Sequence, residues 1–100
     1  MTELKSENFD DVISSSKKCV IDFYATWCTP CKIMNPVLES VENEIGHGSI
    51  YKIDIEQNKD LIQRFNIQSV PTFLFFENGY EKERKIGILS KKYLTESLIP

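Results

Sequence analysis

Histidine and cysteine are scarce in this chain, which has one histidine and three cysteines among 100 residues. The single histidine, His47, stands between two glycines in an expected loop, so mechanisms that pair a nucleophile with a histidine base are nearly excluded. A structural zinc site needs four ligands. One Cys-x-x-Cys pair, the distant His47 and Cys19 in an apolar segment do not make such a set, and we expect no bound metal.

Long apolar runs and an excess of basic residues are also missing. No segment approaches the ~20 apolar residues of a membrane-spanning helix, and the first residues, MTELKSENFDDV, lack the basic and apolar regions of a secretory signal. The net charge of -3 argues against nucleic-acid binding, because proteins that bind nucleic acids usually carry a basic face. The sequence therefore predicts a cytosolic protein with no membrane or nucleic-acid partner.

What the chain does have is the composition of one globular domain. Apolar residues make up 41% and charged residues 27%, and 100 residues suffice for one core without a stabilising disulfide. No repeat, low-complexity segment or linker divides the chain, so we expect a single domain over residues 1–100. In the reducing cytosol, a close pair of cysteines is more often catalytic or metal-binding than structural.

Four strands are expected from the apolar pattern. Buried strands are predicted at residues 19–25 (CVIDFYA), 49–55 (SIYKIDI) and 72–77 (TFLFFE), and a return strand at residues 82–87 (KERKIG). The last two are joined by Asn78-Gly79, which is a strong hairpin signal.

Helices are expected between these strands. Apolar residues at helical spacing predict a helix that follows the cysteine pair, is kinked at Pro36 and stops at Gly46. Shorter helices are predicted after an Asn8 cap, at residues 59–65, and after a Ser90 cap. Helices alternating with strands, with a hairpin at the end, imply a mixed sheet with helices on both sides.

The two neighbouring cysteines lie in the segment WCTPCK, residues 27–32, between a strand and a helix. Cys28 is placed at the helix N-terminus, where unpaired N–H groups and the helix dipole stabilise a thiolate and lower its pKa. Cys31 lies about one turn further along the same side, so the pair can close a disulfide ring. We expect it to be less exposed and to act as the resolving thiol. Pro30 fixes φ at a value suited to the first helical turn.

Asp22 interrupts the apolar strand at residues 19–25, where an ionised carboxylate is costly. On the alternation of a strand, its side chain shares a face with Val20 and Tyr24. Two interpretations remain open: a carboxyl satisfied by a local hydrogen bond, or a buried acid of raised pKa that exchanges a proton with Cys31. Lys52, in the neighbouring strand, either pairs with Asp22 or is an ordinary exposed lysine.

The segments DFYATWCTPCK, SVPTFLFFENG and KIG, with the proline at position 36, resemble the thioredoxin family in order and spacing over nearly the whole chain. The resemblance implies the thioredoxin fold, a three-layer α/β/α structure in which four helices flank a central mixed five-stranded sheet. It also implies reduction of disulfide-containing protein substrates. The electrons would come from a flavoprotein thioredoxin reductase that uses NADPH, with no cofactor held by this chain.

The resemblance also assigns roles to single residues. It makes Cys28 the attacking thiol, Cys31 the resolving thiol and Asp22 the buried acid, and Val70-Pro71 matches the family's cis-proline loop that faces the disulfide. Without this match, Pro71 would be read as an ordinary trans proline at the entry of a strand. The flat apolar surface that receives a substrate's backbone is matched by Trp27, Thr29, Pro30, Val70, Pro71, Gly87 and Ile88.

Three positions depart from the family's pattern. Thr29 replaces a glycine beside Pro30, Tyr24 stands where many members have tryptophan, and Asn66 stands where glycine is common. The threonine adds bulk and a hydroxyl beside the sulfurs, so it bears on redox poise and substrate preference. Cys19 lies outside the motif and is expected to be an inert buried thiol.

The sequence thus predicts a general dithiol reductant that acts as a monomer, with Cys28, Cys31, Asp22 and Lys52 in the chemistry. Two alternatives remain. One is a glutaredoxin-like or oxidising disulfide exchanger, although the glutathione-binding residues of the first and the histidine of the second are not evident. The other is a thioredoxin-fold binding subunit of a larger complex, in which the thiols are incidental.

Overall fold

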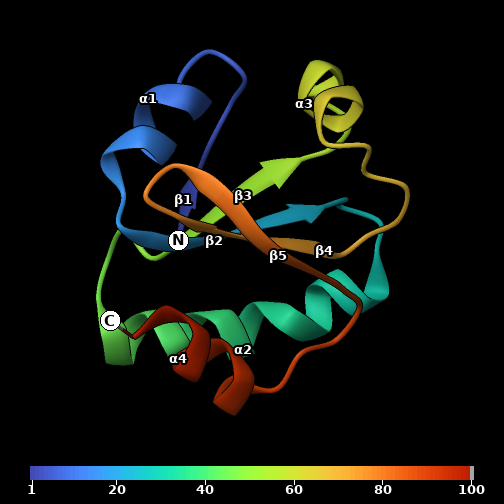
Figure 1. Cartoon of the computed structure of the whole chain (residues 1–100). Coiled ribbons are helices and arrows are strands. Elements are labelled where there is room, and N and C mark those ends of the chain that lie inside the picture. The colour runs from blue at the N-terminus through green and yellow to red at the C-terminus, as the bar shows by residue number, and fades with distance from the viewer. Residues whose placement is uncertain (100) are drawn as a thin grey trace.

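A five-stranded sheet forms the middle of the molecule in a computed structural model, which describes residues 1–99 (Figure 1). Its strands lie in the order β1-β3-β2-β4-β5. Their bounds are Thr2–Glu3 for β1, Lys18–Tyr24 for β2, Ile50–Asp54 for β3, Thr72–Glu77 for β4 and Tyr80–Ile86 for β5. Strands β1, β3 and β2 are parallel, whereas β4 is antiparallel to β2, and β5 to β4, so the sheet is mixed as predicted.

Four helices cover the two faces of this sheet, with α1 and α3 on one face and α2 and α4 on the other (Figure 1). Their bounds are Phe9–Ser15 for α1, Thr29–Ile45 for α2, Lys59–Arg64 for α3 and Lys91–Leu98 for α4. Strand and helix therefore alternate up to the final β4–β5 hairpin. This arrangement confirms the predicted three-layer α/β/α fold.

The alternation of side chains along β2 divides the core in two. Ile21 and Phe23 are buried with α1 and α3, whereas Val20 is buried with α2 and α4. Asp22 has the parity of Val20 and therefore points to the α2 face of the sheet. A carboxylate is thus placed in the same layer as the helix that carries the cysteines.

Most predicted ends of helices are confirmed. Gly46 ends α2 with a φ of 95°, a left-handed value that favours glycine. Ser90 caps α4, because its side chain accepts a hydrogen bond from the Tyr93 N–H. Helix α2 continues through Pro36.

The prediction for Asn8 is wrong in its chemistry. This residue does precede α1, but its side chain makes no capping hydrogen bond to the helix. Its Oδ1 accepts instead from the backbone N–H of Lys5 at 2.9 Å, so it stabilises the turn before the helix.

The two edge strands of the sheet agree with the sequence-based prediction to different extents. Strand β1 has only two residues and matches no predicted segment, yet it pairs in parallel with Tyr51 and Lys52 of β3. Strand β5 is an edge strand and all of its residues are exposed. Within residues 1–99, no helix has both the length and the apolar character needed to cross a membrane.

Candidate active site

Cys28 occupies the N-cap position of α2, four residues after the end of β2. Its Sγ accepts a hydrogen bond of 3.2 Å from the backbone N–H of Cys31, and its carbonyl accepts one from Lys32. The two cysteines form a disulfide with Cα atoms 5.3 Å apart. Pro30 is the second residue of the helix, where its missing N–H costs nothing. The predicted position of Cys28 in the turn between a strand and a helix is confirmed, and Cys31 lies in the first turn of α2.

Both sulfur-bearing residues are buried, with Cys28 4% exposed and Cys31 2% exposed. They cluster with Ala25, and Tyr24 and Val70 pack against this cluster. The order of exposure is the expected one, but the difference is too small to separate the roles of the two thiols. The hydrogen bond to Cys28 Sγ is the feature that distinguishes them.

Asp22 lies fully buried in β2, with 0% of its surface exposed. Within residues 1–99, neither of its carboxylate oxygens accepts a hydrogen bond. Burial is the main cause that raises the pKa of this carboxyl to about 7, partly offset by the nearby charge of Lys52. The interpretation in which a local hydrogen bond satisfies Asp22 is therefore wrong. The chemical role of Asp22 stays a prediction.

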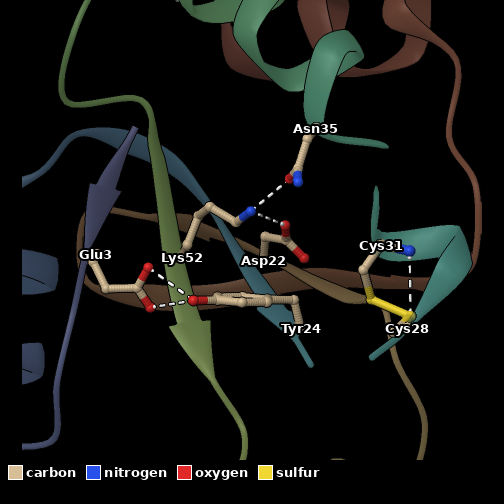
Figure 2. Close-up of polar contacts among 7 residues, drawn as sticks. All are labelled: Glu3, Asp22, Tyr24, Cys28, Cys31, Asn35 and Lys52. Atoms are coloured by element: carbon tan, nitrogen blue, oxygen red, sulfur yellow. Dashed lines mark hydrogen bonds and ion pairs between the residues drawn. A yellow bond between two sulfur atoms is a disulfide. The ribbon is translucent and has the colours of Figure 1, made fainter. Parts of the chain in front are cut away.

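Lys52, in β3, faces this carboxyl, and its side chain is only 13% exposed. Its Nζ lies 3.9 Å from Asp22 Oδ2 and donates a hydrogen bond of 2.5 Å to Asn35 Oδ1 on α2. Figure 2 shows the lysine between these two groups. The alternative of an ordinary exposed strand lysine is wrong, because the side chain is held against Asp22.

Asn35 was not identified from the sequence, although its spacing gives a usable signal. It follows Cys31 by four residues on α2, and residues at that spacing are neighbours on one helix face. The face of α2 that carries Cys31 therefore also binds the lysine beside Asp22. Glu3 was missed as well, and its carboxylate accepts a hydrogen bond from the hydroxyl of Tyr24 (Figure 2).

The loop before β4 meets the segment after β5. The Val70-Pro71 peptide bond is cis. The carbonyl of Pro71 accepts a hydrogen bond of 2.9 Å from the N–H of Gly87, whose φ of 92° favours glycine. Val70 packs against the cysteine cluster. The structure thus brings together the cysteine pair, the proline loop and Gly87.

Exposed apolar side chains surround this meeting point. Trp27 is 64% exposed and Ile88 is 58% exposed, and Thr29 and Pro30 are exposed at the start of α2. A shallow hollow next to Trp27 and Val70 is also lined by Ile55, Ile62, Ile67, Gln68 and Ser69. Large exposed apolar groups in one region are typical of a surface that binds another protein. A role in substrate binding stays a prediction for each of them.

Two positions outside the cysteine motif, Asn66 and Cys19, have a structural account. Asn66 adopts a φ of 51°, a left-handed value that asparagine tolerates better than most residues, which is why it can stand in place of glycine. Cys19 is buried in β2, and burial raises the pKa of its thiol to about 11. Among residues 1–99, no group of histidine, cysteine and carboxylate side chains is arranged to hold a metal ion.

Comparisons with the sequences of known proteins point to the same family as the residues of this site. The sequence profile of the thioredoxin family matches residues 1–99. The chain is 38% identical over 89 residues to a thioredoxin of Mycoplasmoides gallisepticum, covering 89% of both chains. It is 37% identical to a part of a bifunctional thioredoxin reductase/thioredoxin of Mycobacterium leprae, covering 90% of this chain and 20% of that protein.

A solved structure shows the same fold. The thioredoxin of Plasmodium falciparum superposes with a TM-score of 0.87 at 28% sequence identity, covering 96% of this chain and 97% of that one. The profile spans nearly all of the sequence, and the Cys28–Cys31 pair lies at the start of α2, beside the cis-proline loop. The chain therefore belongs to the thioredoxin family of thiol–disulfide oxidoreductases, and Cys28 and Cys31 are its active-site pair.

Proposed function

We propose that this chain is a general reductant of protein disulfides, in which Cys28 attacks and Cys31 resolves. The observation that carries the proposal is the N-cap position of Cys28 on α2, with the N–H of Cys31 directed at its sulfur. Backbone N–H groups at a helix N-terminus stabilise negative charge. In the reduced protein the same contact would favour a thiolate on Cys28 rather than on Cys31.

The reaction is a two-step exchange that moves two electrons. The Cys28 thiolate attacks one sulfur of the substrate disulfide, that disulfide breaks, and the other substrate sulfur leaves as a thiolate that takes up a proton. Cys31 then loses its proton and attacks Cys28 Sγ. The bond between Cys28 and the substrate breaks, the second substrate thiol leaves, and the Cys28–Cys31 disulfide of the present structure forms.

Asp22 is the proposed acceptor of the Cys31 proton. A general base works best when its pKa lies near the working pH, and burial raises the pKa of Asp22 to about 7. The chain of contacts from Asp22 through Lys52 to Asn35 ends one helical turn from Cys31. Lys52 is the charged partner that keeps part of the Asp22 population ionised.

The substrate is proposed to bind across Trp27, Thr29, Pro30, Val70, Pro71, Gly87 and Ile88. Exposed apolar groups gather there, and the N–H and C=O of Val70 form no backbone hydrogen bond within residues 1–99. Backbone pairing with an extended segment tolerates many sequences. Such a surface suits a reductant that acts on many proteins.

A thioredoxin reductase that uses NADPH is the proposed source of electrons, and the cytosol the proposed compartment. The fused relative from Mycobacterium leprae supports this partner, because its printed name joins the two activities in one chain. The present chain is proposed to act as a monomer and to hold no cofactor apart from its redox-active disulfide.

The test is reduction of insulin disulfides, with electrons from NADPH through a thioredoxin reductase or from glutathione. We expect fast reduction with the reductase and slow reduction with glutathione. The matched control is the double variant Cys28→Ser/Cys31→Ser, which should be inactive. Equal rates with both donors would favour a glutaredoxin-like exchanger instead.

A folded parent chain that reduced no disulfide would leave the binding-subunit alternative. In that case the double serine variant should replace the parent in a larger complex without loss of function. Retained activity of the double variant in insulin reduction would contradict the proposed role of the two thiols.

A further inference from the structure

Lys52 has a carboxylate neighbour on each side within the sheet. The strand register pairs it with Glu3 of β1 and with Asp22 of β2. Residues in register on neighbouring strands point to the same face, so Glu3, Lys52 and Asp22 form one row on the α2 face. Two carboxylates in this row could therefore bind a single ammonium group.

Lys52 contacts only one of these two carboxylates. Lys52 Nζ lies 3.9 Å from Asp22 Oδ2, whereas no ion pair joins it to Glu3 in the part of the chain that the structure describes. The carboxylate of Glu3 accepts a hydrogen bond from the Tyr24 hydroxyl instead, and the hydroxyl oxygen lies 2.9 Å from each carboxylate oxygen. Figure 2 shows Glu3 directed at the Tyr24 hydroxyl and Lys52 directed at Asp22 and Asn35.

The ring of Tyr24 also contacts the lysine. Lys52 Nζ lies 4.4 Å from the centre of this ring, a distance at which a cation is attracted to an aromatic face. Burial and the neighbouring Glu3 carboxylate raise the pKa of the Tyr24 phenol, so the phenol remains a hydrogen-bond donor. Tyr24 thus contacts the carboxylate of Glu3 with its hydroxyl and the ammonium group of Lys52 with its ring.

We propose that Tyr24 is a positioning residue, which reserves Lys52 for Asp22 by binding the competing carboxylate of Glu3. The inference rests on the proposed function only where it gives Asp22 a task in the reaction. It adds Tyr24 and Glu3 to the residues that govern the second step, in which Cys31 gives up its proton and attacks Cys28.

The titration of Asp22 is the property that this arrangement controls. The charges that act on it are those of Lys52 on β3 and Glu3 on β1. Tyr24 shares its face of β2, and Cys31 and Asn35 belong to α2, the helix that covers this face. Its partner on β4, Phe73, is uncharged. Lys52 stabilises the carboxylate form, and a Glu3 carboxylate free to bind Lys52 would withdraw that stabilisation. Asp22 would then be protonated over more of the pH range and would accept the Cys31 proton less often.

The test uses a double-mutant cycle of Tyr24→Phe and Glu3→Gln. Tyr24→Phe keeps the ring but releases Glu3, and Glu3→Gln removes the competing charge while keeping an oxygen that can accept the Tyr24 hydroxyl. Tyr51→Phe is the matched control, because Tyr51 lies in the core on the other face of the sheet. The Asp22 carboxyl is followed by carbon NMR against pH in the oxidised protein, which needs no turnover.

We expect Tyr24→Phe to raise the titration midpoint of Asp22 by about half a unit to one unit, a part of the effect of a close opposite charge. In the Glu3→Gln background the same change should have almost no effect, because the competitor is gone. Tyr51→Phe should leave the midpoint unchanged. When Cys28 is held in a preformed mixed disulfide and Cys31 is a free thiol, the pH profile of Cys31 attack on that disulfide should move by the same amount.

Equal shifts in both backgrounds would overturn the proposal, since Tyr24 would then act through packing alone. An unchanged midpoint in folded Tyr24→Phe would overturn it as well. Failure of the proposed function would appear separately, as a parent chain that does not reduce insulin, while the NMR midpoints would still decide the role of Tyr24.

Discussion

The backbone N–H of Cys31 donates a hydrogen bond to the Sγ of Cys28 at 3.2 Å. This contact makes the two sulfurs inequivalent, although both residues are buried to nearly the same extent. Only Cys28 stands at the end of α2, where the unpaired N–H groups gather. The proposed order of attack, Cys28 before Cys31, therefore rests on the helix terminus rather than on exposure.

The first prediction follows from this inequivalence. Cys31→Ser should still attack a disulfide substrate but should not resolve the product, so about one mixed disulfide per chain accumulates at Cys28. Cys28→Ser should accumulate almost none, because Cys31 lacks the helix-terminal donor. Mass spectrometry of both variants after a fixed exposure to an oxidised peptide measures the adducts. Similar amounts in the two variants would contradict the assigned order.

The second prediction concerns the free energy of unfolding of the oxidised protein. The folded pKa of Asp22, about 7, is raised above the ~3.9 of an unfolded aspartate, so the folded state binds the proton more tightly. Stability from this group is therefore present at low pH and is lost as pH rises from about 4 through 7. Between pH 5 and 8 the parent should lose roughly 2 to 3 kcal/mol more than the Asp22→Asn variant.

Urea denaturation of parent and Asp22→Asn at the two pH values measures this difference. The asparagine keeps the shape of the side chain and removes its titration, so other pH effects cancel. Parallel losses in both proteins would show that Asp22 does not titrate in this range.

The third prediction tests the apolar surface. Ile88→Asp should raise the KM for insulin roughly five- to thirtyfold, equivalent to about 1 to 2 kcal/mol, by placing a charge in a desolvated contact. Reduction of a small-molecule disulfide should change little. Tyr80→Asp is the matched control, since Tyr80 is 71% exposed but lies beside the Asn78-Gly79 turn, at the other end of β5 from Ile88. Equal effects of the two variants would remove Ile88 from the binding surface.

The fourth prediction concerns Cys19. Burial raises the pKa of its thiol to about 11, so almost no thiolate is present at pH 8. In the reduced native protein, Cys19 should react with iodoacetamide far more slowly than Cys28, and at a similar rate after unfolding in guanidinium. Peptide mapping of the alkylated chain distinguishes the sites. Comparable labelling of both cysteines in the folded protein would contradict the prediction.

Much of the fold could be predicted, because the long apolar segments carry a clear period. Strands β2, β3 and β4 and helix α2 were found within a residue or two of their observed ends. The return strand was placed two residues late, at residues 82–87, and observed β5 begins at Tyr80 directly after the turn. Charged residues on both of its exposed faces give this strand no apolar alternation.

The parts that sequence reasoning missed depend on contacts between distant segments. Strand β1 has two exposed residues, which is too short for any pattern, and it exists through its pairing with β3. That pairing also brings Glu3 beside Lys52 and Tyr24. Asn35 likewise becomes relevant only once α2 lies over the sheet. Cysteine spacing and an acid in an apolar strand are local signals, whereas the network around Lys52 is not.

The edge strand β5 has a consequence for a chain that is proposed to act on many other proteins. An unpaired strand edge is a template to which another extended chain can add, and such addition leads to aggregation. Residues 81–85 are five charged side chains in a row, EKERK, and all of them are exposed. A chain that paired with β5 would have to bring its own side chains against charges on both faces. The longest open edge of the sheet is thereby made a poor template for co-aggregation with the clients that the chain is proposed to reduce.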